Sequence, residues 1–157
     1  MFNIVMVCTG NICRSPMAER LLLHMLPAGL QDQVIVHSAG IYALHGHQAA
    51  EPAIEAMAQL GIDLSDHRAR QLTREIEQQA DILLGMEHQH LAFIKSLRRW
   101  GRSKAKLLGE FASRDEPMEI EDPYGQPLEA YQACIETLRP CLASVVQWLE
   151  ESQLTKP

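Results

Sequence analysis

Short apolar runs alternate with longer amphipathic segments along this chain, and this alternation restricts the fold more than any other feature. The first run is unbroken, as expected of a strand in a sheet covered on both faces, and the four runs lie at residues 4–7, 34–36, 81–84 and 105–108. Helical patterns begin at residues 16 and 73 and span residues 49–60, 87–97 and 128–151. Such an order predicts a single α/β domain over residues 1–157, a four-stranded parallel sheet with helices on both faces.

Composition excludes several classes of protein. A chain of 157 residues that is 46% hydrophobic buries a core without disulfides, and 14 basic against 20 acidic residues disfavour a nucleic-acid-binding surface. The N-terminal apolar run ends far short of the roughly 20 residues that a membrane span needs. The 4 cysteines form two close pairs at opposite ends of the chain, unlike a secreted disulfide framework. We therefore expect a cytoplasmic protein with reduced thiols and no membrane insertion.

The segment between the first strand and the first helix is the strongest functional signal. Parallel sheets bind ligands outside the carboxyl ends of their strands, and Gly10 and Asn11 tolerate the left-handed conformations that let successive N–H groups converge on an anion. Ser15, as the expected N-cap, adds a positive helix N-terminus. The pattern predicts a phosphate-binding loop made of Thr9, Gly10, Asn11, Ile12, Cys13, Arg14 and Ser15.

Cys8 and Arg14 give this loop a chemistry of its own. The planar guanidinium of Arg14 can hold two phosphate oxygens, and the positive field of the loop stabilises a thiolate on Cys8, which makes it a nucleophile. The phosphate loop of ATPases instead ends in Gly-Lys-Ser/Thr, so nucleoside triphosphate binding is disfavoured.

A thiolate that attacks phosphorus needs a general acid to protonate the leaving oxygen, a contribution of about 100- to 10,000-fold. Asp122 is the best candidate, because Pro123 holds it extended and like charges nearby favour its protonated form; those charges are Asp115, Glu116, Glu119 and Glu121. Without the loop, Asp122 would be an ordinary turn residue before proline. This scheme requires no cofactor and no metal, and the histidine pairs His45, His47 and His88, His90 are expected on the surface.

The loop residues match the pattern Cys-x-Gly-Asn-x-Cys-Arg-Ser, and the segments 38–40, 66–70 and 122–124 extend the match along the chain. At these positions the sequence resembles the low molecular weight protein tyrosine phosphatase family, in its bacterial type, since Gly125 follows Tyr124. The resemblance implies hydrolysis of phosphotyrosine through a phosphocysteine intermediate. It assigns the nucleophile to Cys8, the phosphate clamp to Arg14, and the acid and later base to Asp122.

The resemblance implies further roles around the loop. Asn11, Ser15, Ser38 and His67 are expected to form a supporting hydrogen-bond network, although Ser38 and His67 fit caps and turns nearly as well. Tyr124 is expected on one wall of the pocket, with Leu44 or Tyr42 opposite. Cys13 either forms a reversible disulfide with Cys8 or packs as a small loop residue. The implied partner is an autophosphorylated bacterial tyrosine kinase that controls polysaccharide export; the sequence leaves the oligomeric state open.

Three alternatives share these residues. Arsenate reductases of this fold relay oxidation through cysteines after the third strand, where this chain has Gly85-Met86-Glu87, and Cys134 and Cys141 fit better as core residues of the terminal helix. Protein arginine phosphatases carry threonine in the place of Ile12. A non-catalytic phosphate-binding module would need neither a thiolate at Cys8 nor a distant acid.

Overall fold

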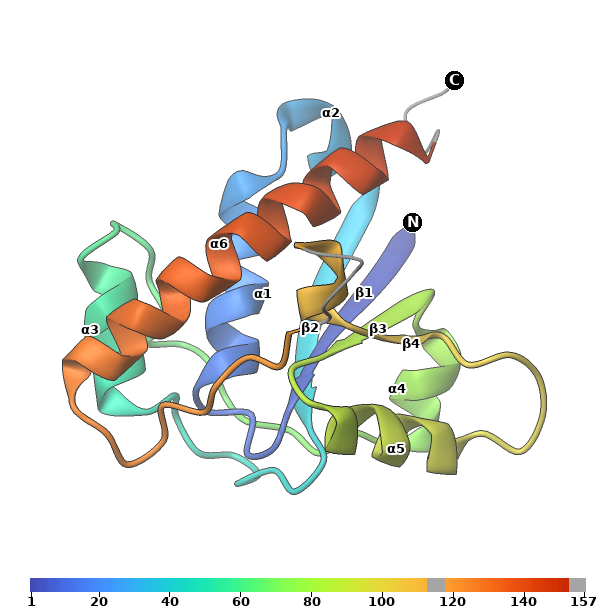
Figure 1. Cartoon of the computed structure of the whole chain (residues 1–157), viewed down its shortest axis with the longest axis horizontal. Coiled ribbons are helices and arrows are strands. Elements are labelled where there is room, and N and C mark those ends of the chain that lie inside the picture. Colours follow the sequence, from blue (N-terminus) through green and yellow to red (C-terminus); the bar gives the residue numbers. More distant parts are fainter. Residues whose placement is uncertain (113–117, 153–157) are drawn as a thin grey trace.

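The computed structural model describes residues 1–112 and 118–152, which form a parallel sheet with helices on both faces (Figure 1). The strands are β1 (Phe2–Cys8), β2 (Val34–Gly40), β3 (Ile82–Gly85) and β4 (Ala105–Leu107). They pair in parallel in the order β2-β1-β3-β4, which confirms the predicted α/β fold. Because β1 lies between β2 and β3, the loop that follows Cys8 is flanked by the carboxyl ends of both neighbours.

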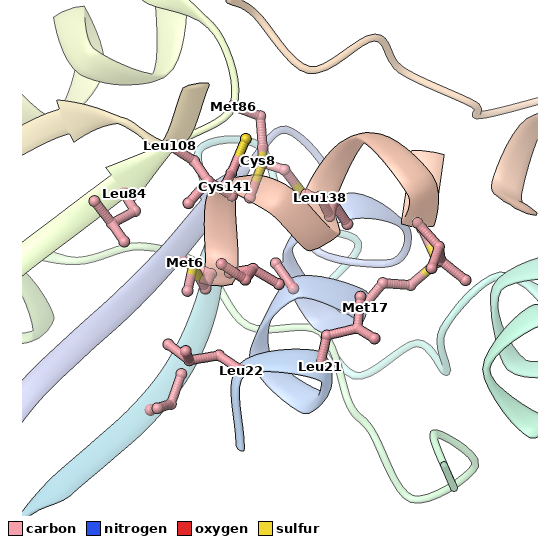
Figure 2. Packing of buried hydrophobic residues seen from close by; sticks show 14 of the residues in the cluster. Met6, Cys8, Met17, Leu21, Leu22, Leu84, Met86, Leu108, Leu138 and Cys141 are labelled. Atoms are coloured by element: carbon pink, nitrogen blue, oxygen red, sulfur yellow. The ribbon is translucent and has the colours of Figure 1, made fainter. Parts of the chain in front are cut away.

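Side chains of β1 alternate between two hydrophobic clusters, one on each face of the sheet. Ile4 and Met6 belong to a cluster with residues of α1 (Arg14–Met25), α3 (Glu51–Ala58) and α6 (Leu128–Glu151), in which α1 lies against β1 and α6 packs on α1 and α3. Val5 and Val7 face α4 (Arg74–Gln79) and α5 (His88–Leu97). Figure 2 shows the first cluster, in which Leu138 and Cys141 of α6 lie over Met6 and the side chains of α1. The central strand is thus anchored on both faces, and the loop at its end rests on a fixed base.

Several boundaries differ from the predicted ones. The first helix begins at Arg14 rather than Pro16, a short α2 (Ala28–Gln31) follows it, and Leu108 belongs to the 3-10 helix η1 (Leu108–Phe111) rather than to a strand. Residues 118–127 contain no helix or strand, as predicted for that segment, whereas residues 115–117 of the predicted loop lie outside the described residues.

The terminal helix continues through Pro140, where the sequence predicts a bend or break. A proline inside a helix costs roughly 3 kcal/mol. Here Leu138, Cys141 and Val145 on either side of it are buried in the core against α1, and this packing offsets the lost hydrogen bond. Among the described residues, no helix combines the length and the apolar character needed to cross a bilayer.

Candidate active site

The loop after β1 turns its carbonyl groups outward. The oxygens of Cys8, Thr9 and Gly10 accept hydrogen bonds of 2.9 to 3.1 Å from the N–H groups of Ile41, Tyr42 and Leu44. The backbone N–H groups of residues 9–13, by contrast, donate to no acceptor in the described part of the chain. With the carbonyls held on the outside, these donors remain on the inner side of the loop, which is the arrangement of an anion-binding nest.

Asn11 fixes the shape of this loop. Its φ of 57° lies in the left-handed region, and its buried side chain is fully used: Nδ2 donates to Ser15 Oγ at 2.8 Å, and Oδ1 accepts from the Arg70 N–H at 2.9 Å. His67 Nε2 donates to the Asn11 carbonyl at 2.7 Å. Asparagine tolerates this backbone conformation, and two of its three contacts join the loop to the segment 67–70 while the third reaches Ser15.

Ser15 points at the nucleophile instead of capping the helix, so the N-cap predicted for it is wrong. Its Oγ lies 2.8 Å from Cys8 Sγ. Because the same oxygen accepts from Asn11 Nδ2, the Ser15 hydroxyl hydrogen is left to donate to the sulfur. The helix begins at Arg14 with Cys13 as N-cap residue, and the serine hydroxyl stabilises negative charge on Cys8.

The Arg14 side chain is buried, only 1% exposed, and its hydrogen bonds hold it in one orientation. Its Nη1 donates to Glu87 Oε1 and, at 2.7 Å, to the Ile120 carbonyl. Burial alone would raise the pKa of Glu87, but the hydrogen bond and charge of Arg14 prevail and the pKa is lowered. Arg14 Nε is buried without a partner among the described residues. Nε is therefore open to one phosphate oxygen, and Nη2, whose contact among the described residues is the ion pair with Asp122, can hold a second one.

Asp122 lies across the site from the loop, with Oδ2 at 3.4 Å from Arg14 Nη2 and its side chain 44% exposed. The Tyr124 N–H donates to its Oδ1 at 3.0 Å, which orients the carboxylate. Of the acidic neighbours invoked from sequence, Glu119 and Glu121 are exposed, and Asp115 and Glu116 lie outside the described residues. The ion pair that the structure gives Asp122 among the described residues is with the cation of Arg14.

These groups surround one cavity of about 220 Å³. Both alternatives for the second wall, Tyr42 and Leu44, line it together with Tyr124. Its floor and rim are formed by Cys8, Thr9, Gly10, Ile12, Cys13, Arg14 and Asp122. The structure thus brings the predicted nucleophile, clamp and acid to one pocket with an aromatic mouth.

Ser38 and the remaining cysteines lie outside this pocket. The Ser38 hydroxyl donates to Glu19 Oε2 at 2.5 Å, and the Ser38 carbonyl accepts from Arg70 Nε, so it reaches the loop only through Arg70. Cys134 is buried in α6, where burial raises the pKa of its thiol to about 12. Cys141 is also buried in that helix. In the described ranges, 1–112 and 118–152, no three His, Cys, Asp or Glu side chains are grouped to hold a metal ion.

Comparison with known families gives the same assignment as the pocket. The family model described as low molecular weight phosphotyrosine protein phosphatase matches residues 3–155. The chain belongs to this family. The low molecular weight protein-tyrosine-phosphatase Etp of Escherichia coli is 39% identical over 130 residues, which cover 83% of this chain and 82% of Etp.

Solved structures of family members superpose over almost the whole chain. The tyrosine phosphatase Wzb of Escherichia coli, in complex with sulphate, is 36% identical and has a TM-score of 0.82, covering 95% of this chain and 99% of Wzb. The YwlE arginine phosphatase of Geobacillus stearothermophilus is 34% identical with a TM-score of 0.87, covering 100% of this chain and 98% of YwlE. The fold is therefore common to family members with different phosphoryl substrates.

Two residues of this phosphatase site were missed from the sequence. Glu87 anchors Arg14, and His90, expected on the surface, is fully buried between Thr9 and the backbone of Glu87. Both follow β3, whose carboxyl end lies beside that of β1. Because parallel sheets bind ligands at the carboxyl ends of their strands, the segment after β3 was a possible part of the site. Only the strand order shows that this segment lies next to the phosphate loop. His45, His47 and His88 are exposed as predicted.

Gly40 offers a direct test of the loop's packing. A Cβ on Gly40 would lie 2.5 Å from the Thr9 carbonyl oxygen and 3.0 Å from the Asn11 nitrogen, so Gly40→Ala must displace the phosphate loop. We expect destabilisation by about 1–3 kcal/mol together with weaker binding of inorganic phosphate, measured by denaturant unfolding and calorimetric titration. Gly29→Ala is the control, since its Cβ meets nothing within 4 Å. Parent-like phosphate affinity in Gly40→Ala would contradict this packing.

Two buried histidines predict a loss of stability in mild acid. Burial lowers the pKa of His67, and burial followed by the charge of Arg14 lowers the pKa of His90 to about 4. The histidines of the unfolded chain have pKa values of about 6.5, so below this pH the unfolded chain binds more protons than the folded one. The stability that these histidines contribute is therefore complete above about pH 6.5 and falls toward pH 4. The shifted pKa of His90 alone should lower the free energy of unfolding by about 3 kcal/mol between neutral pH and pH 4. Unfolding free energies at several pH values should fall less steeply for His90→Gln; equal slopes would refute the assignment.

Proposed function

We propose that this protein hydrolyses phosphotyrosine in proteins through a phosphocysteine intermediate, with no metal or cofactor. The observation that carries the proposal is the position of Cys8 Sγ, 2.8 Å from the Ser15 hydroxyl and at the start of a loop whose backbone N–H groups have no acceptor among the described residues. Arg14 and Asp122 face the same cavity. A nucleophile, a clamp and an acid are thus in place for displacement at phosphorus.

In the first step the Cys8 thiolate attacks phosphorus, the S–P bond forms, and the bond from phosphorus to the tyrosine oxygen breaks. The loop N–H groups and Nε and Nη2 of Arg14 stabilise charge on the equatorial oxygens. Asp122 donates its proton to the leaving phenolic oxygen.

In the second step a water molecule attacks the phosphocysteine. The carboxylate of Asp122 now accepts a proton from this water, the S–P bond breaks, and inorganic phosphate leaves the regenerated Cys8 thiolate. Ser15 stabilises the thiolate as leaving group through the hydrogen bond that it donates to Sγ. No electrons are exchanged, so the cycle needs no redox partner.

The walls of the cavity favour an aromatic substrate. Tyr42 and Tyr124 stand at the mouth, with Leu44 beside them, and their rings can pack against the ring of a phosphotyrosine. Ile12, also in the lining, places an apolar side chain in the loop where arginine phosphatases are expected to carry threonine. Both features support phosphotyrosine over phosphoarginine, although an arginine phosphatase shares the fold.

Initial rates on matched phosphotyrosine, phosphoserine and phosphoarginine peptides test this assignment. We expect the phosphotyrosine peptide to be preferred and Ile12→Thr to narrow its advantage over phosphoarginine. A parent enzyme that prefers phosphoarginine would overturn the substrate class while leaving the phosphatase chemistry intact. Failure to hydrolyse any of the three peptides would overturn the chemistry as well.

The proposed physiological substrate is an autophosphorylated bacterial tyrosine kinase of polysaccharide export. We propose that the protein acts on it in the cytoplasm, as a single phosphatase domain. The relatives Etp and Wzb are described as protein tyrosine phosphatases, which supports the substrate class. Co-expression with such a kinase, followed by detection of its phosphotyrosine, checks the partner. Unchanged kinase phosphorylation in the presence of active enzyme would exclude it.

Cys13 is proposed to protect Cys8 from overoxidation. Burial raises the pKa of Cys13 to about 12 despite its hydrogen bond with Tyr131, so it stays a thiol at neutral pH. Peroxide converts the Cys8 thiolate to a sulfenic acid, and the Cys13 sulfur then attacks it, forming the disulfide and releasing water. We expect dithiothreitol to restore peroxide-treated parent and Cys134→Ala, but not Cys13→Ala. Full recovery of Cys13→Ala, or none in the parent, would refute the protection.

A further inference from the structure

His90 connects the phosphate loop to the segment after β3 that contains Glu87. It is the third residue of α5, it is 0% exposed, and both of its ring nitrogens are used. Nδ1 lies 2.9 Å from the backbone nitrogen of Glu87, and Nε2 lies 3.0 Å from Thr9 Oγ1 in the phosphate loop. A single imidazole therefore bridges the corner that anchors Arg14 and the loop that surrounds Cys8.

The tautomer of His90 follows from its partners. The Glu87 N–H can only donate, so Nδ1 is the acceptor and carries no hydrogen. In a neutral ring the hydrogen is then on Nε2, which donates to Thr9 Oγ1. The ring is neutral at working pH because burial and the charge of Arg14 lower its pKa to about 4, against the opposing effect of the Glu87 and Asp122 carboxylates.

This direction of donation determines what the Thr9 hydroxyl can do. Its oxygen accepts from His90, so its own hydrogen needs a different acceptor, and the described part of the chain provides none. Thr9 lines the same cavity as Cys8 and Arg14. We propose that His90 is a positioning residue that orients the Thr9 hydroxyl to donate a hydrogen bond to an oxygen of the bound phosphate ester. This inference rests on the proposed function.

A purely structural role for His90 is a helix cap, because the Glu87 and His90 side chains form a capping box at the start of α5. Substitutions at Thr9 separate the two roles without touching that cap. Thr9→Val removes the hydroxyl and preserves the shape of the side chain, whereas Thr9→Ser keeps the hydroxyl. His90→Gln keeps an acceptor for the Glu87 N–H, since glutamine is a regular capping-box residue at this position.

Calorimetric titration with inorganic phosphate at neutral pH measures the proposed bond without turnover. We expect Thr9→Val to bind phosphate about 10- to 150-fold more weakly, the range expected for a lost hydrogen bond to a charged group. Thr9→Ser should recover most of this affinity. His90→Gln should weaken phosphate binding in the parent background. It should weaken binding little further in Thr9→Val, because both changes act on the hydrogen bond from the Thr9 hydroxyl to the phosphate.

Two results would overturn the inference. Parent-like phosphate affinity in Thr9→Val would show that the hydroxyl does not contact the anion. Equal losses from His90→Gln in the parent and Thr9→Val backgrounds would show that His90 acts only as a helix cap. Thermal midpoints of all variants identify any that unfold at the assay temperature. Hydrolysis of an aryl phosphate by the parent is measured separately, so a failure of the proposed enzyme activity remains distinguishable from a failure of this contact.

Discussion

Replacing Cys8 with serine should abolish hydrolysis of phosphotyrosine peptides, with a fall in kcat of at least about 10,000-fold, as seen when a covalent nucleophile is lost. Two features favour negative charge on the Cys8 sulfur: the Ser15 hydroxyl lies 2.8 Å away, and the N–H groups of the adjoining loop have no acceptor among the described residues. A serine hydroxyl at this place is far harder to ionise than a thiol, so the same field produces almost no alkoxide. Steady-state rates on an aryl phosphate and on a phosphotyrosine peptide measure the loss.

Cys134→Ser is the matched control, because Cys134 is also a buried cysteine but lies in α6 outside the pocket. It receives the same chemical change and should retain activity at temperatures where it is folded. Calorimetric titration of Cys8→Ser with inorganic phosphate should still show binding, since the loop donors and Arg14 are unchanged. If Cys8→Ser hydrolysed aryl phosphates as fast as the parent, Cys8 would not be the nucleophile.

Asp122→Asn should lower kcat by about 100- to 10,000-fold on substrates with a phenolic leaving group, the range for loss of a general acid. The amide keeps the shape of the carboxyl group but has no proton to give in the first step and cannot act as base in the second. An activated nitrophenyl ester needs little protonation of its leaving oxygen, so its first step, measured as kcat/KM, should be affected much less than that of the phenolic ester.

Glu121→Gln controls for a change of charge in the same segment, because Glu121 is exposed and does not line the cavity with Cys8. Its rates should match those of the parent on both esters. Equal losses for the phenolic and nitrophenyl esters in Asp122→Asn would mean that the substitution disturbs the site generally. In that case a different residue would have to supply the proton.

The sheet and its helices could be predicted because each apolar run and each helical face carries its own periodic signal. Cys8, Arg14 and Asp122 could be found because each belongs to a short motif with a chemical reason. Glu87 and His90 could not, because their function depends on β3 lying next to β1, and strand order is not written in any local pattern. The N-cap at Ser15 was wrong for the converse reason: its hydroxyl fits a local capping pattern, but tertiary structure uses it on Cys8.

The carbonyl groups of the phosphate loop face outward and bind backbone N–H groups of the neighbouring segment, so loop support and pocket lining depend on different atoms of that segment. The segment from Ile41 to Ala50 supports the loop through backbone N–H groups alone, so the identity of Tyr42 or Leu44 has little influence on loop geometry. These side chains nevertheless line the mouth of the pocket. Substitutions of Tyr42 or Leu44 can therefore reshape the mouth of the pocket while the backbone contacts that support the loop are kept.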